Sequence, residues 1–373
     1  MGASQIVYIR TDGNADIAAG HIMRCLTIAE EIIKKNHPVC FLTADKESHS
    51  ILVTHRPDII SVSDIDELLK TETKTNIFSI QLKQAHYQNM EPELPELKSI
   101  LAKKPGPVLI DSYFVTEHYL NELHEVTATA YIDDIYSFKY AVDLLINYDC
   151  FTEERIKELK NEIYKDIPVL LLGAKYAPLR PQFLKNKIEI HHNATNIFVT
   201  TGSSDPYHFI LEFTKLIDQN TDFKQYHYHL VIGSLNTDYH ALKQLANINS
   251  NIHLYTGLTD LMPLMQSCDL AISAGGTTLY ELCTLGIPSF SFSMADNQLE
   301  NPKILNEQEL VPYGGDIRTD MPAVLEKSIR FIAEYSCDYD KRKTVHAKMN
   351  SLFSGDGASQ IADALLNLSF NLK

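Results

Sequence analysis

The chain has 373 residues, a length that fits two domains better than one compact core. Its composition is that of a globular protein, with 45% hydrophobic and 22% charged residues. The formal net charge of −15 argues against nucleic acid as the main partner, although backbone amides and a few Arg can still hold one anionic ligand in a local pocket.

Neither a membrane span nor a secretory leader is expected from the sequence. No run approaches the roughly 18 apolar residues of a transmembrane helix. Residues 1–9 lack the basic start of a signal peptide. The six Cys show no CxxC spacing, which favours reduced thiols. We therefore expect a cytoplasmic protein without stable membrane insertion.

Short apolar runs alternate with helical patterns in the first half of the chain. Residues 5–9 predict a strand, and residues 21–35 predict a helix with an apolar period of about 3.6 residues. Further strands are expected at 38–44, 107–113, 128–134 and 143–148. This alternation is typical of a parallel sheet, whose ligands bind beyond the carboxyl ends of the strands. Polar residues follow or end several strands, namely Asp12, Asp111, Asp133 and Asn147.

The second half of the chain repeats this organisation. A strand with a Gly-rich turn at 196–206 precedes a helix at 209–217. Further strands are expected at 228–233, 251–257, 268–276 and 288–294, with a helix at 277–286 and helical sequence from about 320. The sequence predicts two doubly wound, Rossmann-type α/β domains facing a central cleft. We expect the N-terminal domain at 1–188 and the C-terminal domain at 189–373.

The segment SAGGTTLYEL (273–282) has the character of a phosphate-binding turn. Gly275 and Gly276 follow a strand, and Thr277 and Thr278 open a helix. Glycines let the backbone approach a ligand, and the free amides of a first helical turn favour a phosphate. The alternative is a tight strand–helix turn with Thr as the N-cap.

Three further features favour a pyrophosphate-and-ribose site. Glu281 lies three residues after Thr278 and could reach ribose hydroxyls, although a capping-box glutamate is its alternative role. Asn297 and Gln298 add amide side chains after the next strand. Gly202, in the Gly-rich turn of the same half, completes the candidate nucleotide-binding residues.

Gly20 and His21 stand at the start of the first helix, directly after a strand. We expect Gly20 to let the chain turn sharply, so that His21 faces the cleft at the positive helix end and acts as a base. The alternative is a core histidine with a satisfied hydrogen bond. Asp12 could orient His21, bind a sugar hydroxyl or form an Asx turn before Gly13. Arg24, one turn later, faces phosphate or solvent.

Arg10 and Tyr113 complete the candidate substrate-binding residues of the first half. Arg10 lies on the strand that precedes His21, and the hydroxyl of Tyr113 could contact a sugar. Neither Asp133–Asp134 nor the alternating His227 and His229 has the ligand spacing of a metal site, so we expect no metal and no cofactor. No serine-esterase elbow and no P-loop motif is present.

Several motifs carry a resemblance to known families. Residues 273–298 resemble the nucleotide-sugar segment of the lipid II-forming N-acetylglucosaminyltransferase and its GT-B relatives. A closer resemblance, to the PseG/SpsG-like family, covers most of the chain. Seven blocks occur in the order of that family: IRTDGNADIAAGHIMRCLTIA, LIDSY, YIDD, DLLINY, LLLGAKYAPLRPQF, VTTGSSDP and AGGTTLYEL.

The characterised members of this family are UDP-2,4-diacetamido-2,4,6-trideoxy-β-L-altropyranose hydrolases of pseudaminic acid biosynthesis. The resemblance implies a GT-B-like fold and an inverting attack of water at the anomeric carbon, which releases UDP and the free sugar. It makes His21 the catalytic histidine and Tyr113 and Asn297 active-site residues, with Gln298 as a helper. Ala18 departs from the family, which has the first Gly of Gly-x-Gly-His there.

Two alternative functions stay open. The same architecture would serve a GT-B glycosyltransferase that uses a UDP-sugar donor, because an acceptor hydroxyl can take the place of water. A nonenzymatic nucleotide-sugar binding module is the other alternative. In each case the expected partner is a small UDP-sugar, and the oligomeric state is left open.

Overall fold

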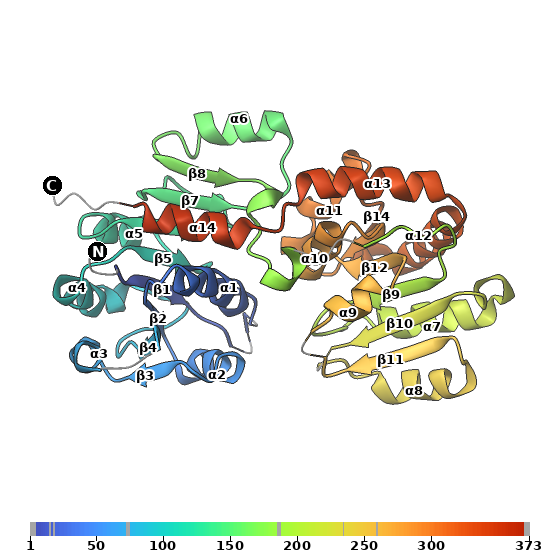
Figure 1. The fold of residues 1–373 in the computed structure, drawn as a ribbon, viewed down its shortest axis with the longest axis horizontal. Helices are drawn as coiled ribbons and strands as arrows, with labels where there is room; N and C mark the ends of the chain where they lie inside the picture. Colours follow the sequence, from blue (N-terminus) through green and yellow to red (C-terminus); the bar gives the residue numbers. More distant parts are fainter. Residues whose placement is uncertain are drawn as a thin grey trace. The chain divides into compact units, whose positions relative to one another are not determined.

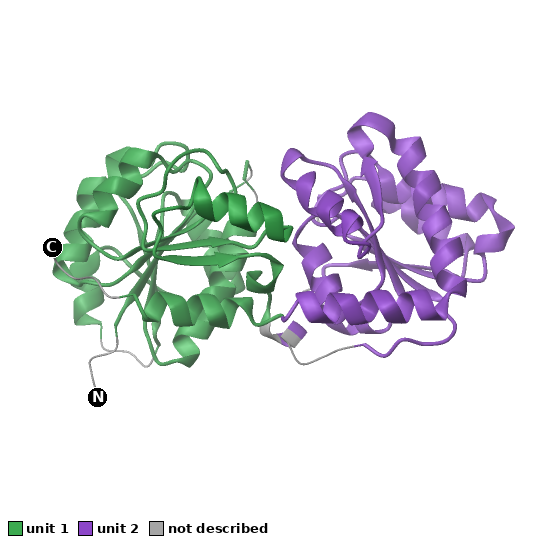
Figure 2. Cartoon of the chain, turned by 90° about the horizontal axis from the view of Figure 1, so that it is seen from above, with its two compact units in different colours: residues 1–180, 355–373 green, residues 181–354 purple. Residues whose placement is uncertain are grey.

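The structure, a computed structural model, describes residues 5–14, 16–17, 19–71, 75–184, 188–233, 235–258 and 260–368. The chain divides into two compact units, shown in different colours in Figure 2. Unit 1 comprises Met1–Arg180 and Gly355–Lys373, and unit 2 comprises Pro181–Ser354. Each unit is built on one parallel sheet, so the predicted two-domain α/β class is confirmed.

Unit 1 contains an eight-stranded sheet of order β3-β4-β2-β1-β5-β6-β7-β8 (Figure 1). Its strands are β1 (Val7–Thr11), β2 (Val39–Thr43), β3 (Ile60–Val62), β4 (Ile77–Gln81), β5 (Val108–Asp111), β6 (Thr129–Ile132), β7 (Leu144–Asn147) and β8 (Val169–Leu172). Its α-helices are α1 (Gly20–Lys34), α2 (Lys46–His55), α3 (Ile65–Lys70), α4 (Leu94–Lys103), α5 (Glu117–His124), α6 (Glu153–Asn161) and α14 (Gly357–Leu366).

The core of unit 1 explains why its central strands are continuous apolar runs. All five residues of β1 and of β2 are buried, because helices cover both faces of the sheet. On one face, α1 contributes Ile22, Cys25, Leu26, Ile28, Ala29 and Ile32 at helical spacing. This packing fixes α1 against the sheet and so places its first turn, with His21, at the carboxyl edge.

The domain boundary differs from the expected one in two ways. The chain passes between the units at Arg180/Pro181 rather than after residue 188. The residues from Gly355 onward return to unit 1, whereas the sequence analysis assigned them to the C-terminal domain. The physical reason is α14, whose buried face joins the apolar cluster of α1 through Ala358, Ile361, Ala362 and Leu365.

Unit 2 contains a six-stranded sheet of order β11-β10-β9-β12-β13-β14. Its strands are β9 (Asn196–Thr200), β10 (His227–Ile232), β11 (Ile252–Thr256), β12 (Leu270–Ala274), β13 (Ser289–Ser293) and β14 (Tyr313–Asp316). Its α-helices are α7 (Phe209–Gln219), α8 (Tyr239–Ile248), α9 (Met262–Gln266), α10 (Thr277–Leu285), α11 (Glu300–Glu307), α12 (Ile317–Cys337) and α13 (Tyr339–Leu352).

Short 3-10 turns join these elements. They are η1 (Glu91–Glu93), η2 (Ala174–Tyr176), η3 (Pro181–Leu184), η4 (Thr221–Phe223) and η5 (Asp296–Gln298). All six cysteines are free thiols. Within the part of the chain that the structure describes, no helix combines the length and the apolar character needed to cross a bilayer.

Candidate functional site

The carboxyl ends of neighbouring strands in unit 1 carry several buried or half-buried polar side chains. β1, β5, β6 and β7 lie side by side in the sheet, and α1 begins beside them. Asp111 ends β5, Asp133 and Asp134 follow β6, and Tyr148 follows β7. The parallel order of the strands thus gathers groups that are far apart in the sequence.

His21 and Asp111 form a buried pair at this edge. Nδ1 of His21 lies 2.6 Å from Oδ1 of Asp111, and the His21 residue is only 4% exposed. Because an ionised carboxylate accepts hydrogen bonds and donates none, Nδ1 carries the proton and donates it to Asp111. Nδ1 of His21 and Nη2 of Arg24 lie 3.0 Å apart, but no hydrogen bond joins them, because both atoms are donors and both donate to Oδ1 of Asp111. This arrangement leaves the lone pair of the neutral ring on Nε2.

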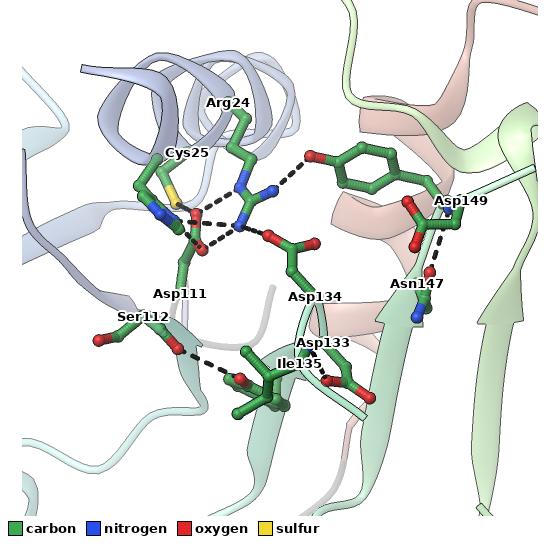
Figure 3. A network of polar contacts seen from close by, with 12 residues as sticks. Arg24, Cys25, Asp111, Ser112, Asp133, Asp134, Ile135, Asn147 and Asp149 are labelled. Carbon is green, nitrogen blue, oxygen red and sulfur yellow. Dashed lines mark hydrogen bonds and ion pairs between the residues drawn. The ribbon is translucent and has the colours of Figure 1, made fainter. Parts of the chain in front are cut away.

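Arg24 holds Asp111 in the ionised state. Its Nε donates to Oδ2 of Asp111 over 2.7 Å, and its Nη2 donates to Oδ1 (Figure 3). Burial raises the pKa of the Asp111 carboxyl, but the charges and hydrogen bonds of Arg24 and His21 outweigh burial. The net pKa of Asp111 therefore lies well below its ordinary value.

Two further groups fix the guanidinium of Arg24. Nη2 donates to Oδ2 of Asp134 over 2.6 Å (Figure 3), and Nη1 donates to the hydroxyl of Tyr148. The thiol of Cys25 also donates to Oδ2 of Asp111, over 3.3 Å. Arg24 therefore points into the network, and its expected orientation toward phosphate or solvent is wrong because three partners on the strand ends bind its donors.

Ligand atoms of His21, Asp111 and Asp134 all lie within 4.8 Å of one another. Such a set could in principle hold a metal ion. The guanidinium of Arg24, however, already donates to oxygens of both carboxylates. The positive charge of Arg24 would repel a divalent cation bound here. The residues present therefore fit a metal poorly.

Arg10 and Asp12 form buried hydrogen bonds that stabilise the carboxyl edge of the sheet in unit 1. Nε and Nη2 of Arg10 donate to the two oxygens of Glu93 over 2.6 and 2.9 Å, and Nη1 donates to Asp12 over 2.5 Å. Arg10 is 0% exposed, which leaves no surface for a substrate and corrects its expected binding role. The other oxygen of Asp12 accepts from the backbone N–H of Ala44 over 2.7 Å. Asp12 therefore does not orient His21, which pairs with Asp111 instead.

The loop before α1 also differs from its expected form. The Asx turn belongs to Asn14, whose Oδ1 accepts from the backbone N–H groups of Asp16 and Ile17 over 3.0 and 3.2 Å. Gly20 is the first residue of α1, and a Cβ there would meet no atom within 4 Å. The expected sharp turn at Gly20 is wrong, because its backbone is already helical. Ala18 lies outside the described residues.

At the start of α1, Gly20 is exposed and His21 is buried. The first turn of this helix carries no acidic side chain, and the N-cap residue Ala19 makes no side-chain cap among the described residues. Tyr113 stands beside it, with its ring 4.4 Å from the ring of His21 in an edge-to-face arrangement and 36% of the residue exposed. The structure therefore places Gly20, His21 and Tyr113 close together, and adds Asp111 as the partner of the histidine.

In unit 2, a tight glycine turn joins β12 to α10. A Cβ on Gly275 would lie 2.6 Å from Pro302 and 3.1 Å from the carbonyl oxygen of Gln298, so only glycine fits. Gly276 is the N-cap of α10 and makes no side-chain cap, and Thr277 and Thr278 are its first two helical residues. The alternative of Thr as the N-cap is therefore wrong, and the first-turn amides have no side-chain cap.

Glu281 and the loop after β13 surround this turn. Glu281 is the fifth residue of α10 and 6% exposed, which rules out the capping-box alternative because that motif needs the third position. Oε1 of Gln298 accepts from the backbone N–H of Met294 over 3.0 Å, and its Nε2 lies 3.8 Å from the Cβ position of Gly276. Asn297 is exposed on the same short turn.

Gly202 lies in the loop before α7. The first amides of this helix already bind a side chain. The φ of Gly202 is +90°, a left-handed conformation that favours glycine. The buried carboxylate of Asp205 accepts from the backbone N–H groups of Phe209 and Ile210, each over 2.9 Å. Because Asp205 already occupies these amides, α10 rather than α7 offers unit 2 an open helix start for a phosphate.

Sequence reasoning missed three residues of the unit 1 network as partners of His21 and Arg24. Asp111 was noted only as a polar strand end, although its place in the LIDSY block was a usable signal. Asp134 was read as a strand-end polar residue. Tyr148, which follows the neighbouring strand β7, ends the DLLINY block, and that place was a usable signal as well.

Comparisons with known proteins agree with this architecture. No protein-family model matches the chain. The spore coat polysaccharide biosynthesis protein SpsG of Bacillus subtilis is 24% identical over 300 residues, which cover 77% of this chain and 85% of SpsG. The uncharacterised protein MJ1062 of Methanocaldococcus jannaschii is 25% identical over 296 residues, which cover 76% of this chain and 54% of MJ1062. The chain thus spans about half the length of MJ1062.

Solved structures share the fold across almost the whole chain. MurG of Acinetobacter baumannii superposes with a TM-score of 0.67 at 12% identity, covering 98% of this chain and 100% of MurG. UGT2 of Phytolacca americana, solved with UDP-2-fluoro-glucose and pterostilbene, has a TM-score of 0.63 at 10% identity and coverages of 97% and 99%. The chain therefore has the GT-B-like fold of these structures.

The Asp111 network predicts a pH-dependent stability of unit 1. Since the pKa of Asp111 is lower in the fold than in the unfolded chain, its ionised form stabilises the fold above about pH 4, and this contribution is lost as the pH falls through the lower folded pKa. We expect Asp111→Asn to lower the free energy of unfolding at pH 7 by about 3–5 kcal/mol, because it breaks a buried ion pair.

This effect can be measured by urea unfolding at pH 7 and at pH 3, with hydrogen exchange of the backbone amides in β1 and α1 as the readout. The deficit of the variant should be smaller at pH 3. Asp58→Asn is the matched control, since Asp58 forms an exposed ion pair with Arg56 and should cost at most about 1 kcal/mol. Equal deficits of Asp111→Asn at both pH values would contradict the assigned pKa direction.

Proposed function

We propose that the chain hydrolyses a UDP-linked 2,4-diacetamido-2,4,6-trideoxy sugar to UDP and the free sugar, in nonulosonic (pseudaminic) acid biosynthesis. The observation that carries this proposal is the buried hydrogen bond of 2.6 Å between His21 and Asp111 at the uncapped start of α1. Support comes from the match to SpsG, a protein of polysaccharide biosynthesis, and from a solved structure of the same fold that holds a UDP-sugar analogue.

His21 serves as the general base in this proposal. Asp111 fixes the tautomer with the proton on Nδ1, and the structure gives Nε2 no hydrogen-bond partner among the described residues. Nε2 removes a proton from a water molecule, whose oxygen attacks the anomeric carbon from the face opposite to the diphosphate. The ionised Asp111 then stabilises the imidazolium that forms, as the carboxylate does in other Asp–His pairs.

The start of α10 supplies the site for the leaving diphosphate. As the bond between the anomeric carbon and the glycosidic oxygen breaks, its electron pair moves to the β-phosphate oxygen. The amides after Gly276 and the helix dipole stabilise this negative charge. UDP is a good leaving group, so the mechanism needs no strong acid on this side.

A glycosyltransferase is the second candidate, because MurG and UGT2 share the fold. In that reaction the same base would take the proton of an acceptor hydroxyl, and the residues at the start of α1 do not separate the two cases. The two functions differ in one observable property. A hydrolase releases UDP from the UDP-sugar in the absence of any acceptor, whereas a transferase depends on one.

Incubation with the UDP-sugar alone in ¹⁸O-water tests the hydrolase. We expect UDP release, with the label at C1 of the free sugar and none in UDP, because the oxygen of water attacks carbon. Label in UDP would show attack at phosphorus and overturn the mechanism. Release of UDP only after addition of an acceptor would favour the transferase.

Replacing His21 should slow the chemical step and leave the binding of UDP almost unchanged. We expect His21→Gln to lower kcat for UDP release by at least about 10²-fold, the range typical of a general base, and to change the affinity for UDP little. Steady-state kinetics and calorimetric titration with UDP measure the two effects. His37→Gln is the control, since His37 bonds only the carbonyl of Gln5 at the far end of α1. Near-wild-type turnover of His21→Gln would remove His21 from the mechanism.

Closing the start of α10 should weaken nucleotide binding. Gly276 has a φ of −94° and room for a side chain, so Gly276→Asp places a carboxylate at the N-cap of α10, where it can accept from the first-turn amides. We expect a loss of UDP affinity of at least tenfold, because the carboxylate competes for the amides and repels the diphosphate. Gly276→Asn is the neutral control of equal shape. An equal loss in both variants would indicate steric exclusion rather than an anion site.

A further inference from the structure

Three imidazoles gather on one face at the free edge of the unit 2 sheet. β11 is the edge strand and pairs with β10, both seen in Figure 1. His227 and His229 alternate along β10, and the parallel register sets His253 of β11 directly beside His229. The sequence suggested only the first two residues as a pair, and the register adds the third.

His227 and His253 point ring nitrogens toward one another. Nδ1 of His227 lies 3.3 Å from Nε2 of His253, and the two ring centroids are 5.5 Å apart with an interplanar angle of 23°. A tetrahedral centre with metal–nitrogen bonds of about 2.0–2.1 Å separates two of its ligand nitrogens by about 3.3–3.4 Å. The observed separation therefore matches the bite of one tetrahedral metal ion.

His229 supports this pair rather than joining it. Its Nε2 lies 3.2 Å from Oδ1 of Asn196, and its Nδ1 lies 3.0 Å from the hydroxyl of Tyr255. Both ring nitrogens therefore have partners. The ring of His229 stacks on that of His253, with centroids 5.1 Å apart at 22°, and so limits the rotation of His253. A ligand ring held by a neighbour loses less freedom on binding.

We propose that His227 and His253 form a surface site for one divalent transition metal ion of the Zn²⁺, Ni²⁺ or Cu²⁺ type, with water molecules completing the coordination. Neutral imidazole nitrogens suit these ions, whereas Mg²⁺ and Ca²⁺ prefer oxygen ligands. In the free protein the N–H of one ring donates a hydrogen bond to the facing nitrogen of the other. On metal binding that proton moves to the second nitrogen of its own ring, so both facing nitrogens offer lone pairs to the metal.

The solvent position of the pair makes the site accessible to ions. His227 is exposed and His253 is half-buried, so an ion reaches them without rearrangement of the sheet. The net charge of the chain, −15, also favours the approach of a cation. The site differs in this respect from the group around His21, where Arg24 supplies a positive charge.

Calorimetric titration of the full chain with ZnCl₂ at pH 7.5 tests the proposal. We expect His227→Ala and His253→Ala each to weaken the binding of one equivalent of Zn²⁺ by at least tenfold. His240→Ala is the matched control, since His240 is an exposed histidine at the start of α8 outside the pair. Wild-type stoichiometry and affinity in both pair variants would overturn the site.

Electron paramagnetic resonance of bound Cu²⁺ gives a second readout. We expect hyperfine coupling to nitrogen in the wild type, and its reduction in either pair variant but not in His240→Ala. Lowering the pH to 5.5 should weaken binding, because protonated imidazoles cannot ligate a metal. If an alanine variant fails to fold by circular dichroism, His227→Gln and His253→Gln replace it. Spectra identical in all variants would show that the metal binds elsewhere.

Discussion

The carboxyl edge of unit 1 depends on one buried ion pair, between Arg24 and Asp111. A buried carboxylate without a partner would take up a proton, and a protonated Asp111 could not fix the tautomer of His21. Arg24 prevents this by donating to both oxygens of Asp111. The guanidinium is in turn held by Asp134 and Tyr148, so helix α1 is tied to the ends of β5, β6 and β7. The packing of α1 thus places His21, and Asp111 at the end of β5 polarises it.

Some helices of the two units have a side chain that accepts hydrogen bonds from their first amides, which closes the helix start, and others leave these amides open. Side chains of Asp45, Asp64, Thr116, Thr152 and Asp205 accept from the first amides of α2, α3, α5, α6 and α7. In contrast, α1 and α10 each follow a strand and have no N-cap side-chain hydrogen bond within the described part of the chain, a property they share with α4, α8, α9, α11 and α14. An uncapped helix start costs some stability in the free protein and leaves a positive electrostatic end for an anionic ligand. Both candidate sites of the chain are built on helices of this open kind.

Some buried charged residues of unit 1 contact His21 directly, whereas others only support the sheet. Arg10, Glu93 and Asp12 form a completely enclosed group beneath the edge of the sheet, to which the hydroxyl of Tyr119 adds a hydrogen bond to Glu93 of 2.6 Å. Such a group is costly to desolvate and contributes little net stability, but breaking one member leaves an unpaired charge. It fixes the carboxyl end of β1, from which the chain enters the loop before His21. Arg10 and Asp12, which precede His21 in the sequence, therefore act on it through the backbone.

Local sequence determined the alternation of strands and helices, the phosphate-type turn at Gly275–Gly276 and the position of His21 at a helix start. These features depend on apolar period and on glycine, which act within a few residues. The partner of His21 was decided by tertiary structure, because Asp111 lies 90 residues away and reaches it only through the pairing of β1 with β5. The return of α14 to unit 1 and the meeting of His227 with His253 were decided in the same way, by a buried helix face and by strand register. Periodicity places a side chain on a face, but only the order of strands in a sheet determines which distant side chain it meets.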